Sequence, residues 1–149
     1  MPWYNTGKGY FAAGFLCYWS SVNASYYATL VTASYVPAES HVYASAFSGS
    51  ELSSISFTAG YNGTGRISFT GRILNINQLS NQGELQANTI VWSGLSAGTA
   101  AAIVYLQQSG TDALSPLVGW TCAGGFPIVT NNTNLTVSFT SAGVLNTTD

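Results

Sequence analysis

Residues that could carry chemistry are few and scattered along the chain. His41 is the only histidine of the sequence, and Glu39 could give it one neighbouring metal ligand. A zinc site needs three or four protein ligands, and no further histidine, cysteine or aspartate lies nearby in the sequence. We therefore expect His41 to be structural or solvated, and we predict no metal site and no cofactor.

Acidic residues could supply the carboxylate pair of a glycosidase. The candidates are Glu39, Glu51, Glu84 and Asp112, which fall in four different loops or strand starts. This spacing gives a catalytic pair little support, and the phosphate-binding motifs GxGxxG and GxxxxGK are absent. We expect no enzymatic activity and assign no catalytic residue.

The two cysteines, Cys17 and Cys122, are too few for a disulfide framework. They could pair in a secreted protein. Neither belongs to a CxxC motif or has a histidine beside it, and cysteine is among the residue types that are most often buried. We expect both to be buried free thiols.

Aromatic residues are more informative than titratable ones. Four tryptophans and nine tyrosines could form a platform on which a sugar stacks. Trp92 and Trp120, however, lie in strand-like sequence, where such rings pack the core or a subunit interface. We expect these two to be buried in one of those ways.

Five aromatic residues precede residue 16, namely Trp3, Tyr4, Tyr10, Phe11 and Phe15. We predict that residues 1–20, with a weak helical pattern over residues 6–16, form an arm that docks on the domain or on a neighbouring chain, because free termini are normally disordered. Residues 8–24 also imitate a signal peptide, but this aromatic load is unusual for one. We expect the segment to be structural and the protein to be made in the cytoplasm.

Charge is the unusual feature of the composition. Only 5% of the residues are charged, three Lys or Arg and five Asp or Glu, where about 25% is ordinary. About a third are Ser, Thr, Asn or Gln. Copies of such a surface repel one another little, and neutral polar groups are cheaper to desolvate than ions. The composition favours a protein that is packed against neighbouring subunits, although secreted β-domains and lectins have a similar composition.

The same charge count excludes two classes of partner. Three scattered cations in a chain of net charge −2 cannot form the basic footprint of a nucleic-acid-binding protein or a polybasic membrane anchor. No stretch approaches the roughly 20 apolar residues of a transmembrane helix. We predict no nucleic-acid and no membrane partner. The candidate interface residues are the five aromatic residues before residue 16 together with Arg66 and Arg72. The two arginines are expected on the outer face of one strand.

Alternation of apolar and polar residues predicts half-buried strands at residues 54–58, 66–73 and 134–140. In the second of these, Ile67, Phe69 and Ile73 are expected to face inward. The Asn62-Gly63 turn signal predicts a hairpin over residues 53–74. Continuous apolar runs predict strands buried on both faces at residues 26–32, 85–92 and 100–106. Residues 117–122 are predicted as a short strand between Pro116 and the Gly124-Gly125 turn.

Six to eight strands separated by turn signals predict an all-β fold, either a β-sandwich or a jelly-roll-like barrel. A chain of 149 residues is enough for one core. We expect residues 21–149 to form a single β-sandwich domain, to which the arm of residues 1–20 is added. The alanine-rich residues 97–102 favour helix, but they run directly into Ile103-Val104-Tyr105 and are predicted as a strand.

Six segments, which cover much of the chain, have a distinctive order and spacing: residues 4–14, 30–41, 86–99, 103–105, 110–119 and 135–145. In this order and spacing the chain resembles a family of bacteriophage structural proteins found in virions. Two features depart from the family. Asn88-Thr89 stand where the family often has acids, and Ala123–Pro127 is an unusual insertion before the last strand.

The resemblance implies a small β-protein of the virion without catalytic residues. We expect a capsid decoration (cement) protein that binds the major capsid protein on the outside of the shell. The alternative is a tail- or fibre-associated protein that binds a host glycan through exposed aromatic rings. By analogy with decoration proteins at threefold positions, we expect a homotrimer. The two departures leave the fold intact but leave the choice of partner open.

Overall fold

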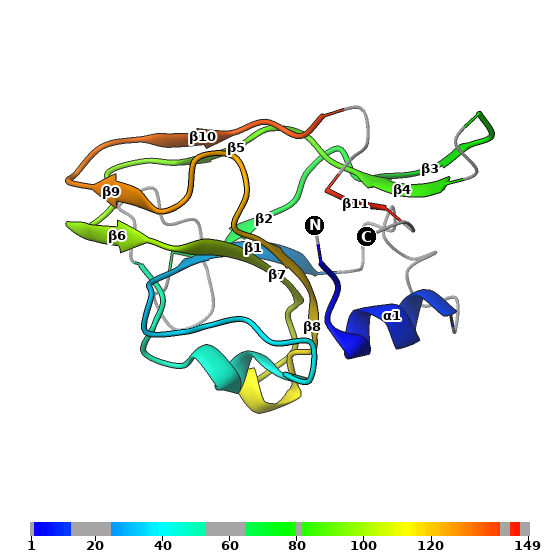
Figure 1. Cartoon of the computed structure of the whole chain (residues 1–149), viewed down its shortest axis with the longest axis horizontal. Coiled ribbons are helices and arrows are strands. Elements are labelled where there is room, and N and C mark those ends of the chain that lie inside the picture. The colour runs from blue at the N-terminus through cyan, green and yellow to red at the C-terminus, as the bar shows by residue number, and fades with distance from the viewer. Residues whose placement is uncertain (1, 13–24, 53–64, 80–81, 141–143, 147–149) are drawn as a thin grey trace.

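A computed structural model gives the structure of the chain and describes residues 2–12, 25–52, 65–79, 82–140 and 144–146. In these residues the helices are α1 (Asn5–Ala12) and the short 3-10 helices η2 (Ala44–Phe47) and η4 (Asp112–Leu114). The strands are β1 (Tyr26–Val31), β2 (Ile67–Ser68), β3 (Ile73–Asn77), β4 (Gln82–Gln86), β5 (Ile90–Trp92), β6 (Gly98–Ala100), β7 (Ala102–Gln107), β8 (Leu117–Thr121), β9 (Ile128–Thr130), β10 (Leu135–Val137) and β11 (Leu145–Asn146) (Figure 1).

The central sheet has the order β2-β1-β7-β8 and is antiparallel. Strands β1 and β7 pair along their length, from Tyr26 opposite Gln107 to Val31 opposite Ala102. Every residue of β8 is buried, and β7 is buried up to Leu106. A strand covered on both faces needs no polar face, which is why these strands are continuous apolar runs in the sequence.

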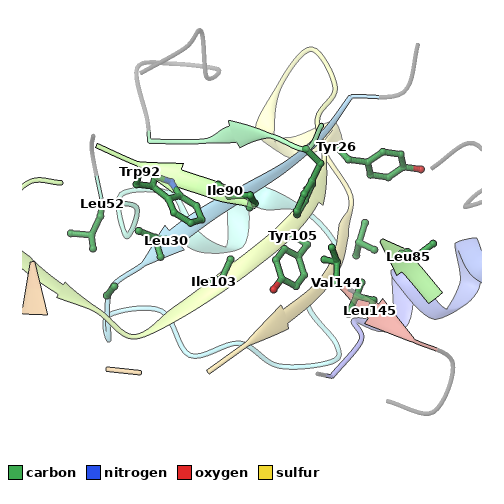
Figure 2. Packing of buried hydrophobic residues seen from close by; sticks show 14 of the residues in the cluster. Tyr26, Leu30, Leu52, Leu85, Ile90, Trp92, Ile103, Tyr105, Val144 and Leu145 are labelled. Atoms are coloured by element: carbon green, nitrogen blue, oxygen red, sulfur yellow. The ribbon is translucent and has the colours of Figure 1, made fainter. Parts of the chain in front are cut away.

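Successive side chains of β7 point to opposite faces of the sheet and therefore join two different cores. Ile103 and Tyr105 belong to the larger core, which lies between the central sheet and the outer strands and also contains Leu30, Leu85, Ile90, Trp92 and Leu145 (Figure 2). Ala102, Val104 and Leu106 belong to the smaller core on the other face, with Tyr4, Tyr35, Phe47 and Trp120.

The outer strands include a two-stranded ribbon that bends in the middle. Strand β5 pairs with β10, and after the bend β6 pairs with β9. Pairing continues through the corner, where the Leu95 amide donates to the Thr133 carbonyl (3.0 Å) and the Asn132 amide donates to the Leu95 carbonyl (2.7 Å). Gly94 and Asn132 have φ of 54° and 53°, a region open to glycine and tolerated by asparagine.

The last of the four sheets, β11-β4-β3, carries a hairpin that extends away from the body (Figure 1). Near its base, Leu74 lies opposite Leu85 and both pack on the larger core. Ile73 and Ile76 of the same hairpin are 55% and 73% exposed. The hairpin therefore presents apolar side chains to the surroundings.

The N-terminal segment closes the outer edge of β8. The Tyr4 amide donates to the Val118 carbonyl and the Trp120 amide donates to the Pro2 carbonyl, both at 3.1 Å. Helix α1 then packs on β8. Gly7 lies so close to this strand that a Cβ atom there would overlap the Val118 carbonyl oxygen. Residues 2–12 of the predicted arm thus dock on their own domain.

The all-β prediction is confirmed. The described residues contain eleven strands where six to eight were expected, because many strands are only two or three residues long and three predicted runs, at residues 66–73, 85–92 and 100–106, are interrupted. Residues 85–92 divide between β4 and β5, and the alanine-rich run continues from β6 into β7. The strands form four hydrogen-bonded sheets instead of two continuous ones.

The positions of the other predicted elements agree with the structure to different degrees. Strands β1 and β8 occupy the predicted runs, β10 is the paired part of the run at 134–140, and α1 begins one residue before the expected helix. Strands β9 and β11 were not predicted. The predicted strand at 54–58 and most of the hairpin at 53–74 lie outside the described residues.

Candidate interaction surface

Arg66 is the main correction to the candidate interface residues. It was expected to point outward, but its side chain is fully buried. Its Nε and Nη2 atoms donate to the two carboxylate oxygens of Glu51 (2.7 and 2.9 Å), and Nη1 donates to Oδ1 of Asp112 (2.9 Å). Thr29 Oγ1 donates to the same Glu51 carboxylate at 2.8 Å, and the guanidinium lies 5.5 Å from the centre of the Phe47 ring.

The surroundings keep this guanidinium charged. Burial acts to lower the pKa of Arg66, but the hydrogen bonds that it donates to Glu51 and Asp112, and the negative charge of these carboxylates, outweigh burial and raise it. The structure thus brings together two of the acids considered for a glycosidase pair, and places an arginine between them. Carboxylates held in charge-assisted hydrogen bonds to an arginine form a structural cluster that joins η4, β1 and the start of β2.

Arg72 does not share a face with Arg66. Its guanidinium lies over the Tyr26 ring, 5.4 Å from the ring centre, and burial lowers its pKa. Gly71, with φ of 58°, separates β2 from β3, so the alternation of one strand does not continue into the next. For the same reason Ile73 is exposed and not inward as predicted.

Trp3 and Tyr4 are also buried, and not displayed for contact with another chain. The Tyr4 hydroxyl lies 2.7 Å from the Tyr35 hydroxyl, and the Tyr4 ring lies 4.5 Å from that of Trp120. Burial raises the pKa of Tyr4 far above its ordinary value. Both rings therefore hold the N-terminal segment to its own domain.

The remaining candidates on the arm are not tested. Tyr10 and Phe11 lie in the last turn of α1, but their side chains are outside the described part, as is all of Phe15. Their role in contacting another chain stays a prediction.

The charged side chains are almost all engaged within the chain. Seven of the eight charged residues, all but Asp149, lie in the described ranges. Beyond the Arg66 cluster and Arg72, Glu84 is buried and accepts hydrogen bonds from Asn75 (2.9 Å) and Gln86 (3.1 Å). Lys8 and Glu39 pair at 2.8 Å, with 47% and 55% of their side chains exposed. Among these seven residues, this pair alone belongs to the exposed surface.

The other sequence candidates lie in ordinary environments. The Tyr35 hydroxyl lies 3.0 Å from Nδ1 of His41, and no group of three or more potential metal ligands occurs within the described residues. Trp92 is in the larger core, where its Nε1 donates to the Gly65 carbonyl at 2.6 Å, and Trp120 is in the smaller core, as expected. Cys122 is a free thiol but is exposed, contrary to prediction, and Cys17 lies outside the described part.

The prediction of no enzymatic activity overlooked one catalytic-type pattern that the sequence does contain. Residues 94–98, Gly-Leu-Ser-Ala-Gly, have the spacing of the GxSxG nucleophile elbow. The elbow requires a strand followed by a helix, so that the serine is exposed on a sharp turn. Here the segment joins β5 to β6 at the corner of the ribbon, and the Ser96 carbonyl accepts a hydrogen bond from Thr130 Oγ1 at 2.6 Å. The structural context of the motif is absent at these residues.

A groove of about 340 Å³ opens between the central sheet and β10. It is lined by Ile103 and Tyr105 of β7, by Thr121 of β8 and by residues 135–140. The loop after β8 also contributes to the lining, and its Gly124 and Gly125 have positive φ. Among the described residues that line the groove, none is charged.

Comparison with protein-family models, with curated proteins and with solved structures finds no match to this chain. Among the helices of the described residues, none is long and apolar enough to cross a membrane.

Proposed function

We propose that this chain is a structural subunit of a bacteriophage virion, and most specifically a capsid decoration protein that binds the outer surface of the shell. The observation that carries the proposal is the internal use of charge. Buried or partly buried contacts engage Arg66, Glu51, Asp112, Glu84 and Arg72, which leaves a nearly uncharged surface. The resemblance of the sequence to virion proteins gives the particle in which such a surface would be used.

A neutral surface suits permanent contact with other subunits. The centres of protein interfaces are depleted of charged residues, because an ion that loses its hydration must find a partner. Neutral Ser, Thr, Asn and Gln side chains can be buried against a neighbour at lower cost. Exposed apolar side chains add area that gains from burial, among them Val36, Ile73, Ile76, Leu114 and Val129.

The tail-associated, glycan-binding alternative has less support. Sugar platforms need exposed aromatic rings, whereas Trp3, Trp92 and Trp120 are all buried, which accounts for every tryptophan in the described part of the chain. Attachment of a neutral subunit to a protein shell needs no such platform. The decoration role is therefore the better supported of the two.

Copy number in purified particles tests this function. Quantitative mass spectrometry of particles of the phage that encodes the chain should find hundreds of copies, in a fixed ratio to the major capsid protein. A handful of copies per particle would indicate a tail or fibre component, and absence from particles would refute the proposal. The expected homotrimer is tested separately by native mass spectrometry of the purified protein.

A further inference from the structure

Two hydroxyl groups and one ring nitrogen form a chain of contacts that links the N-terminal segment to the loop after β1. The Tyr4 hydroxyl lies 2.7 Å from the Tyr35 hydroxyl, which in turn lies 3.0 Å from Nδ1 of His41. Tyr4 is fully buried, Tyr35 is 5% exposed, and His41 is partly exposed. Among the described residues, Tyr35 is the one hydrogen-bond partner of the Tyr4 hydroxyl. The chain of contacts therefore runs from the interior to the surface.

The number of hydrogens fixes the direction of these bonds. Burial raises the pKa of Tyr4 and of Tyr35, so both phenols keep their hydrogens near neutral pH. Each contact takes one hydrogen, and the two phenols supply two. Both hydrogens have an acceptor only if Tyr4 donates to Tyr35 and Tyr35 donates to Nδ1 of His41. The geometry thus selects the neutral imidazole, with its own hydrogen on Nε2.

Protonation of His41 adds a hydrogen that the chain cannot accept. Nδ1 becomes a donor, so three hydrogens share two contacts and one of them has no acceptor. Rotation of the ring away from the chain does not help, because the Tyr35 hydrogen then loses its acceptor in the same buried site. A buried polar group without a partner costs free energy. Withdrawal of Tyr4 relieves this cost, because water then reaches both hydroxyls.

The other titratable groups beside the chain do not change charge in the same pH range. Lys8 of α1 and Glu39 of the same loop pair with each other at 2.8 Å, and Tyr43 of the loop is 42% exposed. Carboxylates ordinarily titrate near about pH 4, and lysine and tyrosine near about pH 10, whereas histidine titrates near about pH 6.5. His41 is the only histidine of the sequence. It is therefore the side chain of this region that responds to mild acid.

We propose that His41 is an acid-sensitive switch for the N-terminal segment. In its neutral form it completes the hydrogen bonds that hold Tyr4 in the smaller core, and in its protonated form it loosens residues 2–4 from the edge of β8. Stability that requires a neutral histidine is present above the titration of the imidazole and is lost as the pH falls through it.

Release of the segment would change the surface of the protein. Pro2 and Tyr4 pair with the backbone of residues 118–120, so their withdrawal opens the edge of β8. An open strand edge is a template for pairing with another chain. The inference goes beyond the proposed function and does not depend on it, since it concerns contacts within the chain.

Native-state hydrogen exchange of the intact protein, measured by NMR, tests the switch. The reporters are the Tyr4 amide, which donates to the Val118 carbonyl, and the Trp120 amide, which donates to the Pro2 carbonyl. After correction for intrinsic exchange rates, their protection should fall about tenfold between about pH 7.5 and about pH 5.5. The Ala101 amide, which donates to the Val31 carbonyl in the body of the domain, should keep its protection. Constant protection of the two reporters, or an equal loss at all three amides, would overturn the proposal.

Two variants assign the effect to this chain of contacts. His41→Asn keeps a side-chain oxygen that accepts from Tyr35 at every pH, so the reporters should stay protected at both pH values. Tyr35→Phe leaves the Tyr4 hydroxyl without a partner at both pH values, so protection should be low and independent of pH. Circular dichroism checks the fold, and if Tyr35→Phe does not fold, His41→Asn decides alone. A fall in protection as steep in His41→Asn as in the unaltered protein would refute the role of His41.

Discussion

At the scale of single residues, Arg66 joins three parts of the chain that are distant in sequence. Its side chain donates to Glu51 and Asp112 in a site that excludes solvent from the guanidinium. Removing one partner of a buried ion pair leaves the other unpaired, at a cost of about 3–5 kcal/mol. We predict that Arg66→Met lowers the free energy of unfolding by about this amount, as measured by urea denaturation.

The exposed pair of Lys8 and Glu39 provides the control. It is solvated on both sides, and exposed pairs contribute less than about 1 kcal/mol. Lys8→Met should therefore change the stability little. If Arg66→Met were as mild as Lys8→Met, the buried cluster would not stabilise the fold.

The buried tyrosines make stability depend on alkaline pH. Burial raises the pKa of Tyr4, Tyr35 and Tyr105 above the ordinary value of 10.0. A raised pKa in the folded state means that stability is complete below the unfolded pKa. It falls above pH 10, because only the unfolded state then releases these protons.

We predict that the free energy of unfolding decreases as the pH rises above 10, as measured by denaturation at fixed pH values. Absorbance of ionised tyrosine should increase together with the loss of folded structure. Tyr4→Phe removes one of the ionising groups and should make the decrease less steep. A stability that stayed constant through this pH range would contradict the buried environment assigned to these phenols.

At the scale of elements, α1 and β8 are fitted together at Gly7. A Cβ atom at Gly7 would overlap the Val118 carbonyl oxygen, whereas a Cβ atom at Gly9 would meet nothing within 4 Å. Both positions lie in the same helix, and alanine favours helix over glycine by about 1 kcal/mol. We predict that Gly9→Ala stabilises the protein slightly, whereas Gly7→Ala destabilises it by about 1–3 kcal/mol through overpacking.

Thermal unfolding of the two variants measures this difference. Because the substitutions are chemically identical, helix propensity cancels between them and the packing of α1 on β8 remains. Equal melting temperatures for Gly7→Ala and Gly9→Ala would show that the helix is not held against the strand as described.

The elements also show what the sequence could predict. Strands buried on both faces, such as β1 and β8, were found because a short apolar run has few other stable forms. The prediction of which side chains of residues 66–73 face inward was wrong. It continued the alternation of apolar and polar residues across Gly71, where the backbone changes direction. Strand β11 is too short to produce a pattern and exists only through its pairing with β4.

Long-range contacts account for the errors at the candidate site. The carboxylates that accept hydrogen bonds from Arg66 lie 15 and 46 positions away in the sequence, and no local sequence pattern predicts these contacts. Trp3 and Tyr4 looked like an exposed arm because the edge of β8 that receives them cannot be recognised from spacing. The groove beside β10 was likewise missed, because its lining comes from strands and a loop that are distant in the sequence.

At the scale of the whole molecule, the small number of charges could be read from composition, and the structure adds where they lie. With Arg66, Glu51, Asp112 and Glu84 in buried or partly buried contacts, few ions remain to attract a partner. In the proposed role, attachment to a shell would rest on apolar area and neutral hydrogen bonds. Salt screens such contacts little and can slightly strengthen apolar burial.

Retention on particles across a range of salt concentrations tests this account most directly. Purified particles that carry the protein are washed at about 0.05 M and about 1 M NaCl, between which the Debye length falls from more than 10 Å to about 3 Å. The amount of protein that stays on intact shells should be the same at both concentrations. Release of the protein at high salt from shells that remain intact would show that ionic contacts hold it, and would contradict the neutral interface proposed for this subunit.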